Sequence, residues 1–188
     1  RRMGARFVMS ARWGRDFSLA HLRREHDAVL IAIGAQRAAP LGCDGDALAL
    51  SGLEFLDRVA CGERPAIGPN VVVVGGGNTA MDASRTALRL GAQHVTVLYR
   101  RTRQEIPCLL EEVEGAEAEG CRIEYLVAPS KIERVSADEL RVVCRRMQLG
   151  EPDASGRRRP VAIPGSEFAL TASCVIAAVG QAVDLSAA

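Results

Sequence analysis

Three consecutive glycines, Gly75, Gly76 and Gly77, follow the apolar run Val71–Val74 and precede a segment with helical spacing. The pattern Gly-x-Gly-x-x-Ala, which runs from Gly75 to Ala80, is typical of the phosphate-binding turn between a strand and a helix. Gly75 allows a tight reversal of the chain, and Gly77 has no β-carbon to block a pyrophosphate. Ala80 is small enough for the helix to pack close to the strand. The spacing therefore predicts a dinucleotide-binding turn.

The first turn of the following helix would supply the hydrogen bonds to the anion. Backbone amides at Asn78, Thr79 and Ala80 have no partner within their own helix, and the helix dipole favours negative charge at this end. We therefore expect residues 75–80 to hold a pyrophosphate. The alternative interpretation is a glycine-rich turn of an α/β protein that binds no ligand.

Two arginines occupy the position that selects the cofactor. NAD sites usually carry an acidic residue about 20 positions beyond the glycine pattern, where it binds the ribose hydroxyls. Here Arg100 and Arg101 stand at this place, and no Asp or Glu occurs between Asp82 and Glu105. Guanidinium groups bind phosphate bidentately, so the pair favours NADPH over NADH. Two solvated surface arginines are the alternative.

The elements around this motif alternate between strands and helices, which indicates an α/β fold. We expect a Rossmann-like NAD(P)-binding domain with a parallel sheet, in which a β-α-β-α-β unit binds the nucleotide. Its predicted strands are 71–74, 95–99 and 122–127, and its predicted helices are 78–90 and 108–119. After Pro129, alternating polar and apolar residues predict an inserted antiparallel ribbon with strands at 131–136, 139–149 and 168–172. Cys174–Val179 then returns as an apolar parallel strand that ends at Gly180.

The first part of the chain carries weaker signals. Arg6–Met9 and the apolar run Asp27–Gly34 are predicted to form strands, the second buried on both faces. Ser18 is a predicted N-cap for a helix over 19–25, and another helix is expected around Gly52–Cys61.

Composition excludes several classes of protein. The formal net charge of the 188 residues is +1, so no overall positive field favours nucleic acid, and Arg157–Arg159 is interpreted as a solvated turn. The longest apolar runs are far shorter than the roughly 18 residues that span a bilayer, so we expect no membrane partner. The six cysteines form no C-x-x-C pair, and the three histidines share no metal-ligand spacing, so no metal site is predicted. A reducing, cytoplasmic location is expected, because no secretory signal is visible.

The same residues resemble a known family. The stretch Val71–Ala83, the Tyr99–Arg101 triplet and the later Gly156–Pro160 (GRRRP) look like the NADPH-binding domain of the glutamate synthase small (beta) subunit. Gly150–Asp153 (GEPD) and Gly165–Glu167 (GSE) extend the similarity, and related FAD-dependent pyridine-nucleotide oxidoreductases share it.

The resemblance implies that NADPH passes hydride to FAD and that electrons continue through iron–sulfur clusters to a partner. The family's FAD-binding glycine loop and cluster cysteines do not occur in this sequence, so the partner is expected to be a missing FAD and iron–sulfur portion of a parent chain or a large subunit. Residues 1–66 then look like a strip of the FAD-binding domain. Residues 67–180 look like the NADPH domain, with an insertion at about 130–172, and residues 181–188 return toward the FAD domain.

The nicotinamide end of the site is less defined by the sequence. Gly180 is a candidate, because a residue without a side chain at that strand end would let the nicotinamide approach. No catalytic residue is identified; Glu111 and Glu112 belong to a glutamate-rich helix that is either solvated or near the nicotinamide. Three alternatives remain open: a non-catalytic nucleotide-sensing or interaction module, a different NADPH:flavin reductase linked to iron–sulfur clusters, and an NAD-type dehydrogenase acting directly on a small substrate.

Overall fold

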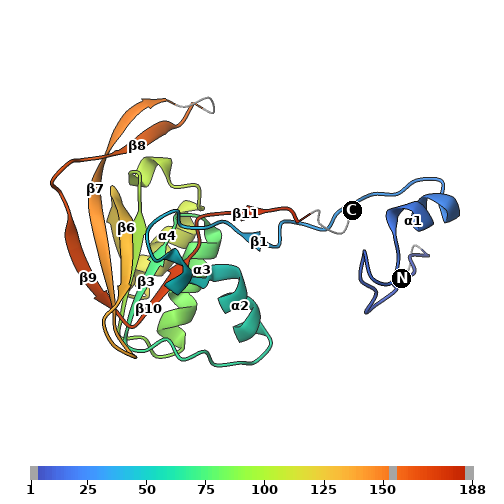
Figure 1. The fold of residues 1–188 in the computed structure, drawn as a ribbon, viewed down its shortest axis with the longest axis horizontal. Helices are drawn as coiled ribbons and strands as arrows, with labels where there is room; N and C mark the ends of the chain where they lie inside the picture. The colour runs from blue at the N-terminus through green and yellow to red at the C-terminus, as the bar shows by residue number, and fades with distance from the viewer. Residues whose placement is uncertain (1–3, 153–155, 185–188) are drawn as a thin grey trace. The chain divides into compact units, whose positions relative to one another are not determined.

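The computed structural model describes residues 4–152 and 156–184 (Figure 1). It divides into one compact unit, Ala38–Gly180, and a smaller unit built from the described residues that flank it on both sides. The larger unit contains the whole candidate site.

A five-stranded parallel sheet forms the centre of the larger unit, in the order β2-β10-β3-β4-β5. The strands are β2 (Leu50–Ser51), β3 (Asn70–Val74), β4 (His94–Tyr99), β5 (Arg122–Tyr125) and β10 (Cys174–Ala177). The predicted α/β, Rossmann-like class is confirmed, and the predicted strands at 71–74, 95–99 and 174–179 agree with it to within two residues at each end. Apolar runs as continuous as Val71–Val74 suit strands that are covered on both faces.

Helices cover one face of this sheet: α2 (Gly52–Ala60), α3 (Asn78–Arg89) and α4 (Leu110–Ala118) (Figure 1). Strand residues Val71 and Val73 point to this side, where they pack with Phe55 and Met81, both fully buried. In α3 the small residues Ala80, Ala83 and Ala87 are fully buried, so the helix lies close against the strands.

An antiparallel sheet covers the other face and is the predicted ribbon. It is built from β6 (Val127–Arg134), β7 (Leu140–Pro152), β8 (Arg158–Ala162) and β9 (Phe168–Ala172). The alternate strand residues Val72, Val74 and Leu98 pack against Val127 and Val142 of this layer. The alternating pattern does not predict β8, because two charged residues, Arg158 and Arg159, begin the strand. The chain passes from the parallel to the antiparallel sheet at Leu126, whose φ is +56°.

Residues 38–66, which the sequence placed in the FAD-domain strip, pack with the parallel sheet. β2 pairs with β10, and the buried Phe55 of α2 belongs to the same core as α3. A 3-10 turn, η1 (Asp46–Leu48), precedes β2, and a second, η2 (Arg103–Glu105), follows β4.

The smaller unit differs from expectation. Helix α1 (Leu19–Glu25) forms as predicted, with Ser18 Oγ accepting a hydrogen bond of 3.1 Å from His21 N. The predicted strands Arg6–Met9 and Asp27–Gly34 are wrong: neither range contains a strand, and Leu30 is 90% exposed. An apolar run becomes a buried strand only beside hydrogen-bonded neighbours, and the structure places none along these ranges. The short strands β1 (Arg37–Ala38) and β11 (Gln181–Ala182) pair with each other.

Candidate nucleotide-binding site

Each glycine of the turn between β3 and α3 has its own structural reason. Gly75 has a φ of +146°, and a β-carbon there would stand 2.2 Å from the carbonyl oxygen of Ala178. The amide of Ala178 donates to Val74 O at 2.8 Å, so the end of β10 lies directly beside the turn. Gly75 is therefore required by its left-handed backbone and by this close approach.

The neighbouring glycines face different surroundings. A β-carbon on Gly76 would lie 2.4 Å from Cδ2 of Tyr99, so this glycine makes room for an aromatic ring. A β-carbon on Gly77 would meet nothing within 4 Å among the described atoms. Gly77 therefore borders open space at the start of α3, which is where a bound pyrophosphate is expected.

The first turn of α3 presents its amides to that space. Gly77 is the N-cap, and its carbonyl accepts from Ala80 N at 2.9 Å, so the prediction of a free amide at Ala80 is wrong. No side chain caps the helix. The amides of Asn78 and Thr79 thus keep the orientation that suits an anion. Ala80 is fully buried, as its predicted packing role requires.

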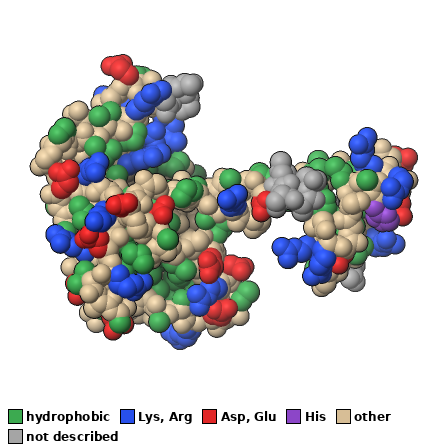
Figure 2. Space-filling view, in the orientation of Figure 1, with side chains coloured by type: hydrophobic (Ala, Val, Ile, Leu, Met, Phe, Trp, Pro, Cys, Tyr) green, Lys and Arg blue, Asp and Glu red, His purple; other side chains and the backbone are tan. Residues whose placement is uncertain are grey.

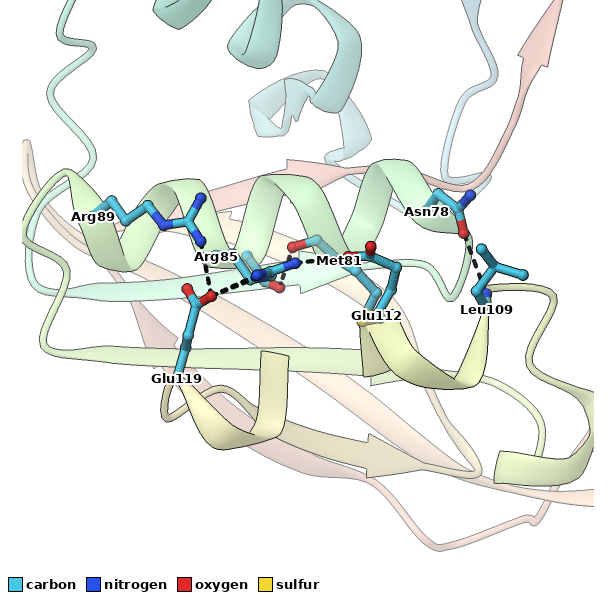
Figure 3. Close-up of polar contacts among 8 residues, drawn as sticks. Asn78, Met81, Arg85, Arg89, Leu109, Glu112 and Glu119 are labelled. Carbon is cyan, nitrogen blue, oxygen red and sulfur yellow. Dashed lines mark hydrogen bonds and ion pairs between the residues drawn. The ribbon is translucent and has the colours of Figure 1, made fainter. Parts of the chain in front are cut away.

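The side chain of Asn78 joins the beginnings of two helices. Its Oδ1 accepts a hydrogen bond of 3.4 Å from the amide of Leu109, the residue just before α4 (Figure 3). Farther along, Arg85 of α3 donates to Glu112 at 2.7 Å and to Glu119 at 2.8 Å, and Arg89 donates to Glu119 at 2.8 Å. These bonds fix α4 against α3 and so hold the surface beside the turn.

These contacts also assign part of the glutamate-rich helix. Glu112 and Glu119 are ion-pair partners of Arg85, and Glu117 pairs with Arg103 at 2.7 Å. The hydrogen bond from Arg85 lowers the pKa of Glu119 most, with Arg89 adding to the effect. Glu112, Glu117 and Glu119 therefore act as ion-pair partners of arginines, and these contacts do not indicate a catalytic acid or base.

The structure separates the two arginines that the sequence grouped together. Arg100 is exposed at the end of β4, in the position expected for a group that binds a 2′-phosphate. Arg101 is only 7% exposed, and its Nε donates to the carbonyl oxygen of Arg158 at 2.8 Å. Arg101 thus joins the end of β4 to the beginning of β8.

A third arginine, Arg157, reaches the same strand end. Its Nη2 donates to the carbonyl oxygen of Glu105 at 3.0 Å and lies 3.4 Å from the hydroxyl oxygen of Tyr99. The sequence pattern predicts a solvated turn at Arg157, because the pattern of an inserted hairpin does not show how the hairpin is placed on the parallel sheet. The feature of the sequence that could have pointed to this residue is the run of three arginines, Arg157–Arg159.

Gly180 follows two residues after Ala178, which lies against the glycine turn. It has a φ of +137° and is exposed, and a β-carbon there would meet nothing within 4 Å. Its carbonyl oxygen accepts from Ala39 N at 3.0 Å. Because Ala178 contacts Gly75, the chain at Gly180 leaves β10 from the same sheet edge as the turn.

Metal-ligating side chains do not gather in the described part of the chain. Residues 4–152 and 156–184 contain no group of three or more His, Cys, Asp or Glu side chains arranged to hold a metal ion. All six cysteines are free thiols, and burial raises the pKa of Cys144 to about 12 and that of Cys174 to about 11. None of the described helices is both long and apolar enough to cross a membrane.

Comparisons with known proteins identify the family. The family model for pyridine nucleotide-disulphide oxidoreductase matches residues 10–187. The chain is 47% identical over 193 residues to an NADPH-Fe(3+) oxidoreductase subunit beta of Geobacter sulfurreducens. This match covers 98% of this chain and 28% of that protein. It is also 41% identical over 183 residues to the glutamate synthase [NADPH] small chain of Azospirillum brasilense, across 89% of this chain and 37% of that protein. The predicted resemblance is confirmed, and the chain spans well under half the length of these relatives.

A solved structure shares the fold. Thioredoxin reductase from Giardia duodenalis superposes with a TM-score of 0.55 over 77% of this chain and 41% of that chain, at 23% sequence identity. At this identity the likeness concerns the fold alone.

Proposed function

Because the chain belongs to the pyridine nucleotide-disulphide oxidoreductase family, we propose that it binds NADPH at the β3–α3 turn for hydride delivery to FAD. The FAD would be held by a part of the parent protein outside this chain. The two relatives described above are oxidoreductases, and the matched region is 28% of the length of one and 37% of the other.

One observation carries the proposal: the three glycines do not face the same surroundings. Neighbouring protein atoms leave no room for a side chain at Gly75 or Gly76, whereas a β-carbon on Gly77 would meet nothing within 4 Å apart from its own chain neighbours. A residue without a side chain, beside open space and uncapped helical amides, is the arrangement that a pyrophosphate requires.

The remaining residues would orient the dinucleotide along the carboxyl ends of the strands. Amides of Asn78 and Thr79 would bind the pyrophosphate, and Arg100 would bind the 2′-phosphate at the end of β4. Gly180 would leave space for the nicotinamide half at the end of β10. When bound, NADPH supplies the hydride, while this chain supplies binding and orientation.

The proposed FAD site lies outside this chain. Gly75–Gly77 is the single run of three glycines in the sequence, and NADPH would occupy the turn that it forms. The FAD and any iron–sulfur clusters would therefore come from the parent polypeptide or a large partner subunit. The final electron acceptor then depends on that partner, as the differing names of the relatives illustrate.

Binding can be tested directly by titrating the chain with NADPH and NADH and following its thermal unfolding. Ligand at 100 times its dissociation constant stabilises a fold by about 2.7 kcal/mol. We expect a clear rise of the unfolding temperature with NADPH and a smaller one with NADH at equal concentration. If neither nucleotide shifts the transition, or if Gly77→Val leaves the NADPH shift unchanged, the proposal is wrong.

A further inference from the structure

We propose that Arg157 is a binding residue of the nucleotide site and contributes to the choice of NADPH over NADH. This inference rests on the proposed function. It concerns a residue that lies far along the chain from the glycine turn and from Arg100, on the antiparallel layer.

The first support is position. In a Rossmann-like site the adenosine ribose lies at the end of the strand that follows the glycine-rich helix, which is β4 here. Tyr99 is the last residue of β4, and its ring lies against Gly76 of the turn. The Arg157 Nη2 is 3.4 Å from the hydroxyl oxygen of this same tyrosine. Arg157 therefore reaches the strand end at which the 2′-phosphate of NADPH is expected.

The second support is that the position is fixed by several contacts. The Tyr99 hydroxyl donates to the carbonyl oxygen of Glu105 at 2.6 Å, and Arg157 donates to the same oxygen at 3.0 Å. The next residue, Arg158, accepts a hydrogen bond of 2.8 Å from the buried Arg101. Both the side chain of Arg157 and the backbone beside it are thus attached to the end of β4, so little ordering is left for a ligand to impose.

The third support is electrostatic. Arg100, Arg101 and Arg157 bring three arginine residues to one strand end. Guanidinium groups bind phosphate oxygens through charge-assisted hydrogen bonds, so this strand end suits an anionic ligand with several phosphate oxygens. Figure 2 shows Lys and Arg side chains gathered in the hollow below the β7–β8 hairpin.

The two arginines that follow Arg157 have different surroundings from it. Arg158 turns back to its own hairpin, where its Nε donates to Gly150 O at 3.1 Å and its Nη2 to Leu149 O at 2.9 Å. Arg159 lies exposed on β8. Arg159 therefore provides a matched control, with the same charge on the same hairpin.

The test compares Arg157→Gln with Arg159→Gln in the 188-residue chain. Dissociation constants are measured for NADPH and NADH, and for the adenosine probes 2′,5′-ADP and 5′-AMP. We expect Arg157→Gln to weaken NADPH and 2′,5′-ADP by about tenfold or more, as loss of a charge-assisted hydrogen bond predicts. NADH and 5′-AMP should change by less than about twofold, and Arg159→Gln should leave all four within about twofold.

Other outcomes overturn the inference. An equal loss for phosphorylated and unphosphorylated ligands would make Arg157 a residue that only shapes the strand end, and an equal effect of Arg159→Gln would reduce the finding to general charge. Arg157→Lys, which keeps the charge, should retain part of the NADPH preference if the variant with Gln folds poorly. Failure of the unaltered chain to bind either dinucleotide would instead reject the proposed function itself.

Discussion

The aromatic ring of Tyr99 occupies the space that a side chain on Gly76 would need. A β-carbon there would lie 2.4 Å from Tyr99 Cδ2 and 2.6 Å from Cε2. The ring cannot move away freely, because Tyr99 is 5% exposed and its hydroxyl is bonded to Glu105 O at 2.6 Å. The glycine turn is thus packed on its β4 side and open at Gly77.

Gly76→Ala should therefore destabilise the fold. Overpacking a buried contact of this kind costs about 1–3 kcal/mol, because the ring or the turn must shift. The free energy of unfolding, measured with urea, is expected to fall by that amount. Displacement of the turn should weaken NADPH binding as well.

Gly77→Ala provides the matched comparison. Its φ of −88° suits any residue, and an added β-carbon meets nothing within 4 Å, so the free energy of unfolding should stay within about 0.5 kcal/mol. Binding of NADPH should nevertheless decrease, because the methyl group would enter the space proposed for the pyrophosphate. Similar stability losses in the two variants would contradict this division of roles.

The two arginines after β4 should respond differently to removal. Arg101→Ala removes the buried bond to Arg158 O and should lower the free energy of unfolding by about 1–3 kcal/mol. Arg100→Ala should leave stability nearly unchanged, because the side chain is exposed, while reducing the preference for NADPH over NADH. Raising the salt concentration should also weaken that preference in the unaltered chain, since exposed charges are screened. A preference that survives both Arg100→Ala and high salt would exclude Arg100 from the 2′-phosphate site.

Local sequence patterns were sufficient for the part of the site that is contiguous in the chain. The residues from Val71 to Ala80 carry strand, turn and helix signals that agree with one another, and β3 and α3 form where expected. Arg157 was missed because its contact with Tyr99 spans many residues and depends on how a hairpin is placed on a sheet. Periodicity carries no such information.

The opposite error occurred at Asp27–Gly34. Its apolar run has the composition of a buried strand, but Leu30 is 90% exposed and the structure has no strand there. Composition describes the surroundings in which a segment would be stable, whereas pairing requires neighbouring strands. The segment is therefore apolar, as its composition indicates, but the prediction that it pairs as a strand is wrong.

The reactivity of the cysteines should follow their burial. Cys61 is exposed, whereas burial raises the pKa of Cys144 to about 12 and of Cys174 to about 11. The thiolate is the reactive form, so an alkylating reagent at pH 8 should modify Cys61 first in the folded chain. Mass spectrometry of the intact protein checks this order, with Cys61→Ser as the control that removes the fast phase. Labelling of Cys144 at the rate of Cys61 would contradict the described packing.

Acid should weaken the attachment of α4 to α3. The pKa of Glu119 is lowered from 4.5, chiefly by its hydrogen bond from Arg85, so the folded state favours the charged carboxylate. A group with a lowered folded pKa adds stability above its ordinary pKa, and this contribution is lost as the pH falls through the folded value. The difference in unfolding free energy between the unaltered chain and Arg85→Ala should thus be largest above about pH 5 and shrink toward pH 3.

Arg89→Ala tests whether this effect belongs to the specific contact. Arg89 also bonds Glu119 at 2.8 Å, but its side chain is 62% exposed against 25% for Arg85, and Arg85 holds Glu112 as well. Exposed ion pairs contribute little, so Arg89→Ala should change both stability and its pH dependence less than Arg85→Ala does. Equal effects would mean that general charge governs the acid sensitivity. A larger loss for Arg85→Ala, together with weaker NADPH binding, would link the α3–α4 contacts to the surface beside the glycine turn.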